Sequence, residues 1–174
     1  MKMYNKNRYW GVITLFLGLI LQARSDDSID TNVQIQVNQL PTVESKIEYL
    51  SSLVAAEQDS SSITSNIRKS SAIILLGQIG GTNVIDILIT NLIYIDKRYN
   101  GSPASHALIL IGEPVVPQLL DVLRNSDDEA KVRRAATTIG FIESRNWKKF
   151  SEQQKNILPK KAWDRLIRYA IIVS

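Results

Sequence analysis

Cysteine is absent from this sequence of 174 residues, and histidine occurs once, as His106. Without cysteine the chain has no disulfide bond, no thiolate metal ligand, no cysteine nucleophile and no thioether-linked lipid. A single histidine excludes a metal centre built from several histidines and leaves one imidazole for acid–base chemistry. A glycine-rich phosphate loop is also missing. We therefore expect no metal site and no cofactor, and the residues show no catalytic constellation.

The apolar stretch near the N-terminus, residues 10–21, is too short to cross a membrane. It has twelve residues, whereas a spanning helix needs about 20. Three basic residues and no acidic one precede it, and the small residues Ala23 and Ser25 follow it. This pattern predicts a signal peptide over residues 1–25 and a periplasmic or secreted protein. The alternatives are an uncleaved anchor, which would add a membrane contact, and an ordinary amphipathic first helix.

The formal net charge of +4 belongs to that leader. Residues 1–25 contain four basic residues, so the remainder holds 17 residues of each sign. The remainder is neutral but polarised, because residues 26–100 contain five basic and nine acidic residues and residues 101–174 contain twelve and eight. We therefore expect no nucleic-acid partner. This difference in charge between the two halves would orient a bound partner or favour head-to-tail association of copies of the chain.

Beyond the leader the sequence predicts a short linker followed by helices. Residues 26–40 are polar and predict a flexible linker, although the alternation of Val33, Ile35 and Val37 also suits a short strand. Residues 41–174 carry apolar side chains at spacings of three and four, which is the helical period. The expected helices are 42–57, 61–79, 83–96, 102–111, 114–125, 127–142, 147–157 and 159–172.

Three of these segments are similar to one another, at spacings of 32 and 31 residues. They are aligned on an isoleucine before a turn, with a leucine or isoleucine three positions earlier and an alanine four positions before that. The matched sets are Ile79, Ile111 and Ile142; Leu76, Leu108 and Ile139; and Ala72, Ala104 and Ala135. Gly80 and Gly112 suit a positive φ after the first helix, and Ser102-Pro103 suits a helix start. Helix pairs repeated at this period predict an α-solenoid.

The strings IRKSSAIILLGQIG, IGEPVVPQLLDVL and VRRAATTIGFI resemble the short HEAT-like repeats of bacterial proteins. The resemblance covers about residues 61–145 and implies an all-α solenoid of about three helix pairs with capping helices. Members of that family include scaffolds, phycobilin lyases and DNA-repair relatives, so the resemblance implies an architecture and no single activity. It also implies that Arg68 and Arg133 form an inter-repeat ladder, which is a row of ion pairs between successive repeats. In this ladder Asp127 or Asp128 would pair with Arg133. The third repeat departs from the pattern, because Glu143-Ser144 replaces glycine and its second helix is polar.

The function that these features predict is an exported scaffold or adaptor that binds another protein. The second helix of each repeat lines the concave face in such families, so its polar residues are the expected contacts. They are Asp86, Thr90, Gln118 and Asp121, and His106 of a first helix is a further expected contact in the groove.

Two other functions remain open. The first is an enzyme or enzyme subunit of the lyase type, in which His106 would act. The second is a membrane-surface protein that keeps its N-terminal segment and uses the basic, aromatic residues 131–174 as a second contact. We interpret those residues instead as a capping region with core aromatics and solvated lysines.

Overall fold

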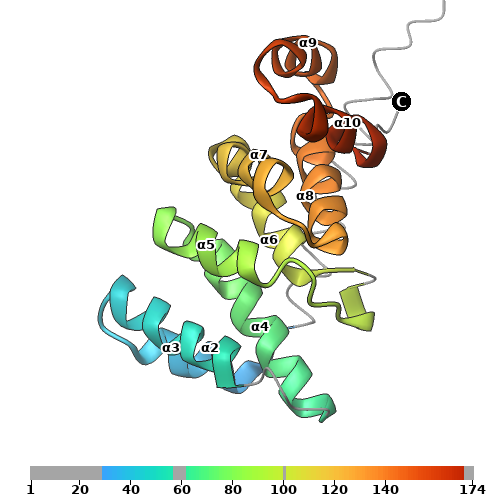
Figure 1. Cartoon of the computed structure of the whole chain (residues 1–174). Coiled ribbons are helices and arrows are strands. Elements are labelled where there is room, and N and C mark those ends of the chain that lie inside the picture. The colour runs from blue at the N-terminus through green and yellow to red at the C-terminus, as the bar shows by residue number, and fades with distance from the viewer. Residues whose placement is uncertain (1–28, 57–61, 100, 171–174) are drawn as a thin grey trace, which may run out of the picture.

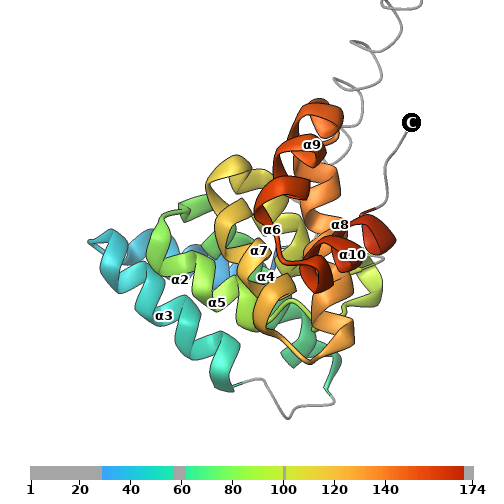
Figure 2. The ribbon, with the colours of Figure 1, turned by 45° about the horizontal axis from the view of Figure 1, so that its top comes forward.

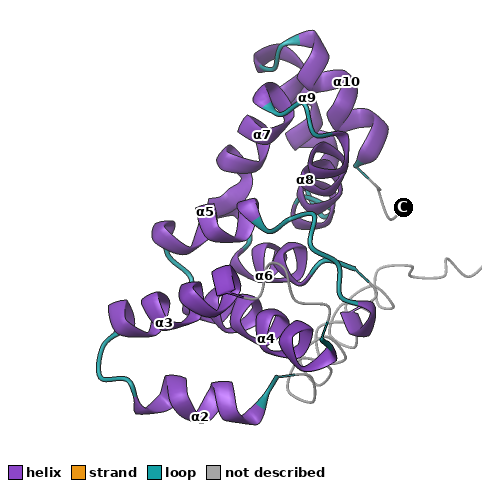
Figure 3. Ribbon diagram, turned by 60° about the horizontal axis from the view of Figure 1, so that its bottom comes forward, coloured by secondary structure: helices purple, strands orange, loops and turns teal. Residues whose placement is uncertain are grey.

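The computed structural model describes residues 29–56, 62–99 and 101–170 (Figure 1). Within these ranges the chain forms nine α-helices and two short 3-10 helices, with no strand beyond an isolated bridge between Asp96 and Gly101 (Figure 3). The all-α prediction is confirmed. The signal peptide predicted over residues 1–25 lies outside the described residues.

The helices alternate with short turns along the chain. Their bounds are α2 Thr31–Gln39, α3 Val43–Ala56, α4 Ile63–Ile79, α5 Thr82–Thr90, α6 Pro103–Ile111, α7 Val116–Asn125, α8 Glu129–Ile142, α9 Trp147–Ile157 and α10 Lys160–Tyr169. The 3-10 helices are Lys97–Tyr99 and Glu113–Val115.

The helices pack on their neighbours and on their next neighbours in the chain order. α4 lies against α3 and α6, α6 lies against α8, and α8 lies against α7 and α10. The helices therefore run from α2 and α3 at one end of the molecule to α9 and α10 at the other (Figure 1). This order of packing is consistent with an α-solenoid.

The positions matched between the repeats form the centre of the core. The three matched alanines are fully buried, and so are Leu76, Leu108 and Ile139. The small alanine side chains let α4, α6 and α8 approach closely, while the larger side chains fill the space between them. At Gly77 the approach leaves no space for a methyl group, because a Cβ there would lie 2.5 Å from the Cβ of Ala107.

The turns after α4 and α6 have the predicted chemistry. Gly80 and Gly112 have φ angles of 69° and 82°, and their N–H groups donate to the carbonyls of Leu76 and Leu108. Such angles strain any residue with a Cβ, which explains the two glycines. Glu143 stands at the matching position after α8 with a φ of −90°, so no glycine is required there. Pro103 begins α6, and Ser102 Oγ accepts the N–H of Ser105 at 3.3 Å.

The linker prediction for residues 26–40 is wrong for residues 31–39, which form α2. Asp30 caps this helix by accepting the N–H groups of Asn32 and Val33. Val33 and Val37 are buried, whereas Ile35 is 48% exposed. The valines are four positions apart, which puts them on one helical face, and the alternation with Ile35 hid this period. The backbone N–H of Asp30 also donates to Ser71 Oγ on α4 at 2.7 Å.

The helix predicted over 83–96 ends earlier, at Thr90. Asn91 terminates α5 by donating its side-chain amide to the carbonyl of Ile87 at 2.9 Å. Residues 91–99 then return toward α4 as a loop, because Asp96, Tyr94 and Arg98 all bond to α4 side chains or carbonyls.

The C-terminal helices close the other end of the molecule. α10 lies across α7 and α8 (Figure 2), with Ala162 and Leu166 buried. Arg165 donates to the carbonyls of Leu123 and Ser126, which are at the end of α7. The side of α10 that carries Ala162 and Leu166 therefore packs on the preceding helices, whereas Ile167 is 46% exposed.

Candidate functional site

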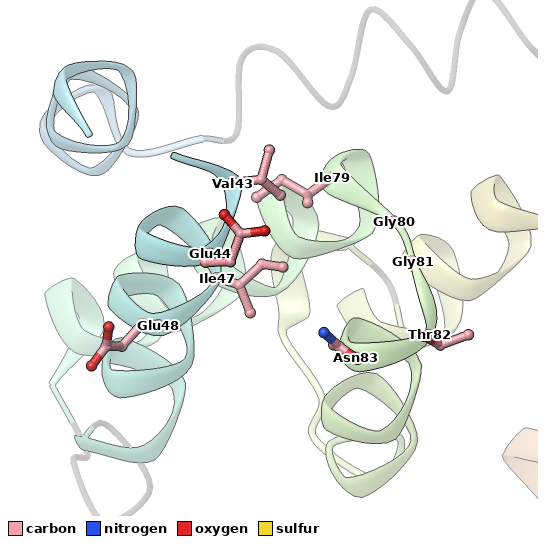
Figure 4. Close-up of a pocket in the computed structure, with 9 residues that line it drawn as sticks. All are labelled: Val43, Glu44, Ile47, Glu48, Ile79, Gly80, Gly81, Thr82 and Asn83. Carbon is pink, nitrogen blue, oxygen red and sulfur yellow. The ribbon is translucent and has the colours of Figure 1, made fainter. Parts of the chain in front are cut away.

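A surface depression of about 500 Å³ lies between α3 and the turn that joins α4 to α5 (Figure 4). Residues from the first half of α3 form one wall, and the end of α4 with the start of α5 forms the other. The lining residues are Val43, Glu44, Ile47, Glu48, Ile79, Gly80, Gly81, Thr82 and Asn83.

The depression combines an apolar floor with two carboxylates. Ile47 and Ile79 are half-buried against the core, and Val43 is 54% exposed beside them. Glu44 and Glu48 are exposed and one helical turn apart on α3 (Figure 4). Neither carboxylate forms an ion pair with another described residue. A wall of this kind suits a ligand that carries an apolar group beside positive charge.

The two glutamates destabilise the helix that carries them. Like charges at positions i and i+4 of a helix repel each other at a cost of about 0.2–0.5 kcal/mol. The first, Glu44, offsets part of this cost because it lies in the first turn of α3, where the helix dipole favours negative charge. Glu48 has no such compensation.

The polar residues predicted to contact a partner do not come together in this depression. Asp86 and Thr90 are exposed on α5, where Thr90 Oγ1 donates to the carbonyl of Asp86. Asp121 on α7 is 60% exposed and pairs with Arg124 at 2.6 Å. Gln118 is half-buried, and its Oε1 atom is buried with no hydrogen-bond partner among the described residues.

Sequence reasoning missed the depression, although one signal was present. Glu44 and Glu48 alternate with Val43 and Ile47 at helical spacing, which marks a mixed acidic and apolar edge on α3. The opposite wall, from the turn at Gly80 and Gly81, is 32 or more residues away in the chain and comes from tertiary packing alone.

His106 lies half-buried in the middle of α6 and is not among the residues that line the depression. Burial lowers its pKa below the usual histidine value. At neutral pH its imidazole is therefore neutral.

The predicted inter-repeat ladder is wrong for Arg133. The carboxylate of Asp128 caps α8 by accepting the N–H groups of Ala130 and Lys131. Asp127 pairs with Lys161 of α10 at 3.5 Å. Arg133 instead lies 5.8 Å from the ring centre of Tyr169. α10 packs beside α8 and supplies these two partners, which the repeat pattern does not contain. Arg68 is half-buried on α4, and its place in an inter-repeat ladder stays a prediction.

A buried polar cluster joins α4 to the loop after α5. Asp96 is 6% exposed and accepts hydrogen bonds from Ser70 Oγ, the Arg98 side chain and the Arg98 backbone N–H. Burial alone would raise the pKa of Asp96, but the hydrogen bonds from Arg98 and Ser70 and the charge of Arg98 hold it below the ordinary value. Tyr94 completes the cluster by donating to the carbonyl of Asn66 and by lying 4.6 Å from Lys69 Nζ. These contacts fasten the loop to α4, and the Arg98 side chain at the edge of the cluster is 34% exposed.

A second buried carboxylate, Glu143, has a pKa shifted in the opposite direction from that of Asp96. Burial and the nearby charge of Glu113 raise the pKa of Glu143, which is 9% exposed. Within the described ranges, no three His, Asp or Glu side chains are close enough together to hold a metal ion.

None of the helices in the described part of the chain is, by itself, long and apolar enough to cross a membrane. Residues Pro103–Ile111 and Glu113–Asn125 reach the required length and composition only when taken together, and they meet at an angle of 114°.

Comparisons of this chain with the models of known protein families, with curated proteins and with solved structures gave no match. The resemblance to HEAT-like repeats therefore stays a prediction from the sequence.

Proposed function

We propose that this protein is an exported scaffold that binds a partner protein in the depression between α3 and the α4–α5 turn. The observation that carries the proposal is the pair of exposed glutamates beside an apolar floor. Those glutamates raise the energy of α3, and a cationic partner would convert the repulsion into attraction. The segment that binds there has lysine or arginine side chains next to an exposed apolar side chain.

The depression is open to solvent rather than enclosed, which suits a protein segment. Its floor offers three aliphatic side chains, Val43, Ile47 and Ile79, and its second wall ends in the backbone of Gly80 and Gly81. Asn83 projects toward α3 and offers an amide for a hydrogen bond (Figure 4). These groups give contact area and orientation, whereas the two carboxylates give the charge preference.

A photo-reactive residue placed at Asn83 is expected to cross-link the partner in the exported fraction. The double variant Glu44→Lys/Glu48→Lys should lower the yield about tenfold, which corresponds to about 1.4 kcal/mol of binding free energy. Mass spectrometry of the cross-linked species measures the yield and identifies the partner segment.

The matched control is Asp86→Lys/Asp121→Lys, which reverses two other exposed acidic side chains on α5 and α7. It should leave the yield at Asn83 unchanged. A different result would contradict the proposal: the yield stays unchanged in Glu44→Lys/Glu48→Lys and falls in Asp86→Lys/Asp121→Lys. The partner would then bind α5 and α7, whose residues the sequence favours.

Export is the second part of the proposal and rests on residues 1–25. We expect N-terminal sequencing of the native protein to begin at Arg24 or Asp26, because cleavage follows a small residue such as Ala23 or Ser25. A native chain that begins at Met1 would replace export with an N-terminal anchor.

A further inference from the structure

We infer that the partner segment is supplied by a second copy of this chain, whose α9–α10 turn docks in the depression of the first copy. This inference rests on the proposed function and gives the bound segment an identity. The two surfaces lie toward opposite ends of the molecule, so one copy cannot satisfy its own depression (Figure 1).

The α9–α10 turn has the chemistry that the depression requires. Ile157 is 65% exposed at this turn. Three lysines surround it in sequence: Lys155 before it, and Lys160 and Lys161 after it, all exposed. An apolar tip with positive charge on both sides matches an apolar floor with two carboxylates at its edge.

Two lysines of the turn lie where the helix dipole makes positive charge unfavourable. Lys160 and Lys161 occupy the first turn of α10, which contains no acidic residue, and the helix dipole disfavours positive charge there. Their own ion pairs are weak competitors. Lys160 is 90% exposed in its pair with Asp164, and Asp127 is 94% exposed in its pair with Lys161. Exposed pairs of this kind contribute about 0–1 kcal/mol.

The charge of the described residues is uneven along the chain. Residues 29–56 and 62–99 contain five basic and five acidic residues, so the negative charge at the depression is the local pair Glu44 and Glu48, whereas residues 101–170 contain twelve basic and eight acidic residues. A contact of the turn with the glutamate pair brings opposite charges together, whereas a contact between two turns brings like charges together. One such contact leaves one depression and one turn of the pair free, so further copies can add until the assembly closes into a ring or continues as a filament.

The test is the mass of the native chain in solution, measured by sedimentation equilibrium over a range of concentrations. The wild-type chain should associate at about 50 mM salt and dissociate toward about 500 mM, because screening weakens contacts between exposed charges. Glu44→Lys/Glu48→Lys should raise the dissociation constant at least about tenfold, and so should Lys155→Glu/Lys160→Glu. Each variant substitutes exposed side chains, and circular dichroism checks that the helices are retained.

The decisive measurement mixes the two variants. A chain with a reversed depression keeps a normal turn, and a chain with a reversed turn keeps a normal depression. The mixture should therefore associate although neither variant does so alone. In that mixture the two depressions also carry opposite charges, so the mixing is repeated with Glu44→Gln/Glu48→Gln and Lys155→Gln/Lys160→Gln. Between these neutral variants a symmetric contact of depression with depression gains no attraction, whereas the normal turn of one copy still meets the normal depression of the other.

Three results would overturn the inference: a monomer at every concentration, association that neither reversal weakens, or association that only one reversal weakens. The proposed function is tested separately by the Lys155→Glu/Lys160→Glu variant. If that variant still cross-links a different protein through Asn83, the depression binds a partner and only its identity as a second copy is wrong. If cross-linking at Asn83 is absent in every variant and in the wild-type chain, the proposed function fails as well.

Discussion

Replacing Asp96 with alanine is expected to lower the free energy of unfolding by about 3 kcal/mol. The carboxylate is buried, and three donors lose their acceptor at once: Ser70 Oγ, the Arg98 guanidinium and the Arg98 backbone N–H. Ser70 is itself fully buried on α4, so its hydroxyl cannot turn to water and keeps only the longer contact of 3.3 Å with Tyr94 Oη. The loss would release the loop of residues 91–99 from α4. Urea unfolding followed by circular dichroism measures the change.

Asp121→Ala is the matched control, because Asp121 also pairs with an arginine but is 60% exposed. Its expected cost is below about 1 kcal/mol. Equal costs at the two positions would show that the cluster around Asp96 contributes no more than a surface ion pair.

The pH dependence of Asp96→Asn follows from the lowered pKa of Asp96. A carboxyl whose pKa is lower in the folded than in the unfolded state stabilises the protein fully above the unfolded value, which is about 3.9. That contribution disappears as the pH falls through the folded value. The difference in stability between wild type and Asp96→Asn should therefore stay constant from neutral pH to about pH 4 and shrink at lower pH.

Replacing Gly77 with alanine is expected to cost about 2 kcal/mol, although alanine is the better helix former by about 1 kcal/mol. The added Cβ would lie 2.5 Å from the Cβ of Ala107 and 2.9 Å from its Cα. Neither atom is the end of a flexible side chain, so α4 and α6 would have to move apart. Thermal unfolding measures the loss.

The double variant Gly77→Ala/Ala107→Gly separates this clash from other effects. Removing the methyl group of Ala107 should recover part of the loss, which a double-mutant cycle reports as a coupling between the two positions. Gln78→Ala, at the exposed neighbouring position, should change stability by less than about 0.5 kcal/mol. A stabilised Gly77→Ala variant would contradict the close approach of α4 and α6.

The buried positions of the repeats were accessible to sequence analysis because they depend on local periods. Ala72, Ala104 and Ala135 recur at one place in three similar segments, and all three are fully buried. Gly80 and Gly112 mark turns because a positive φ favours a residue without a Cβ. Such signals need only neighbouring residues, and the helices follow from them.

The elements that were missed depend on partners distant in the chain. α2 forms from a segment that resembled a linker, and the serine that receives the Asp30 N–H is 41 positions away. Arg133 contacts Tyr169 because α10 folds back over α8, which no repeat pattern encodes.

The sequence by itself determined the helical class, the repeat period and the buried positions that the three similar segments share, because helix formation and amphipathic spacing are properties of neighbouring residues. Only the tertiary structure decided where Glu44 and Glu48 meet the turn at Gly80, and how Asp96 meets Ser70 across 26 positions. A surface depression and a buried polar cluster are made by packing, and packing is fixed by contacts between segments that are far apart in the chain.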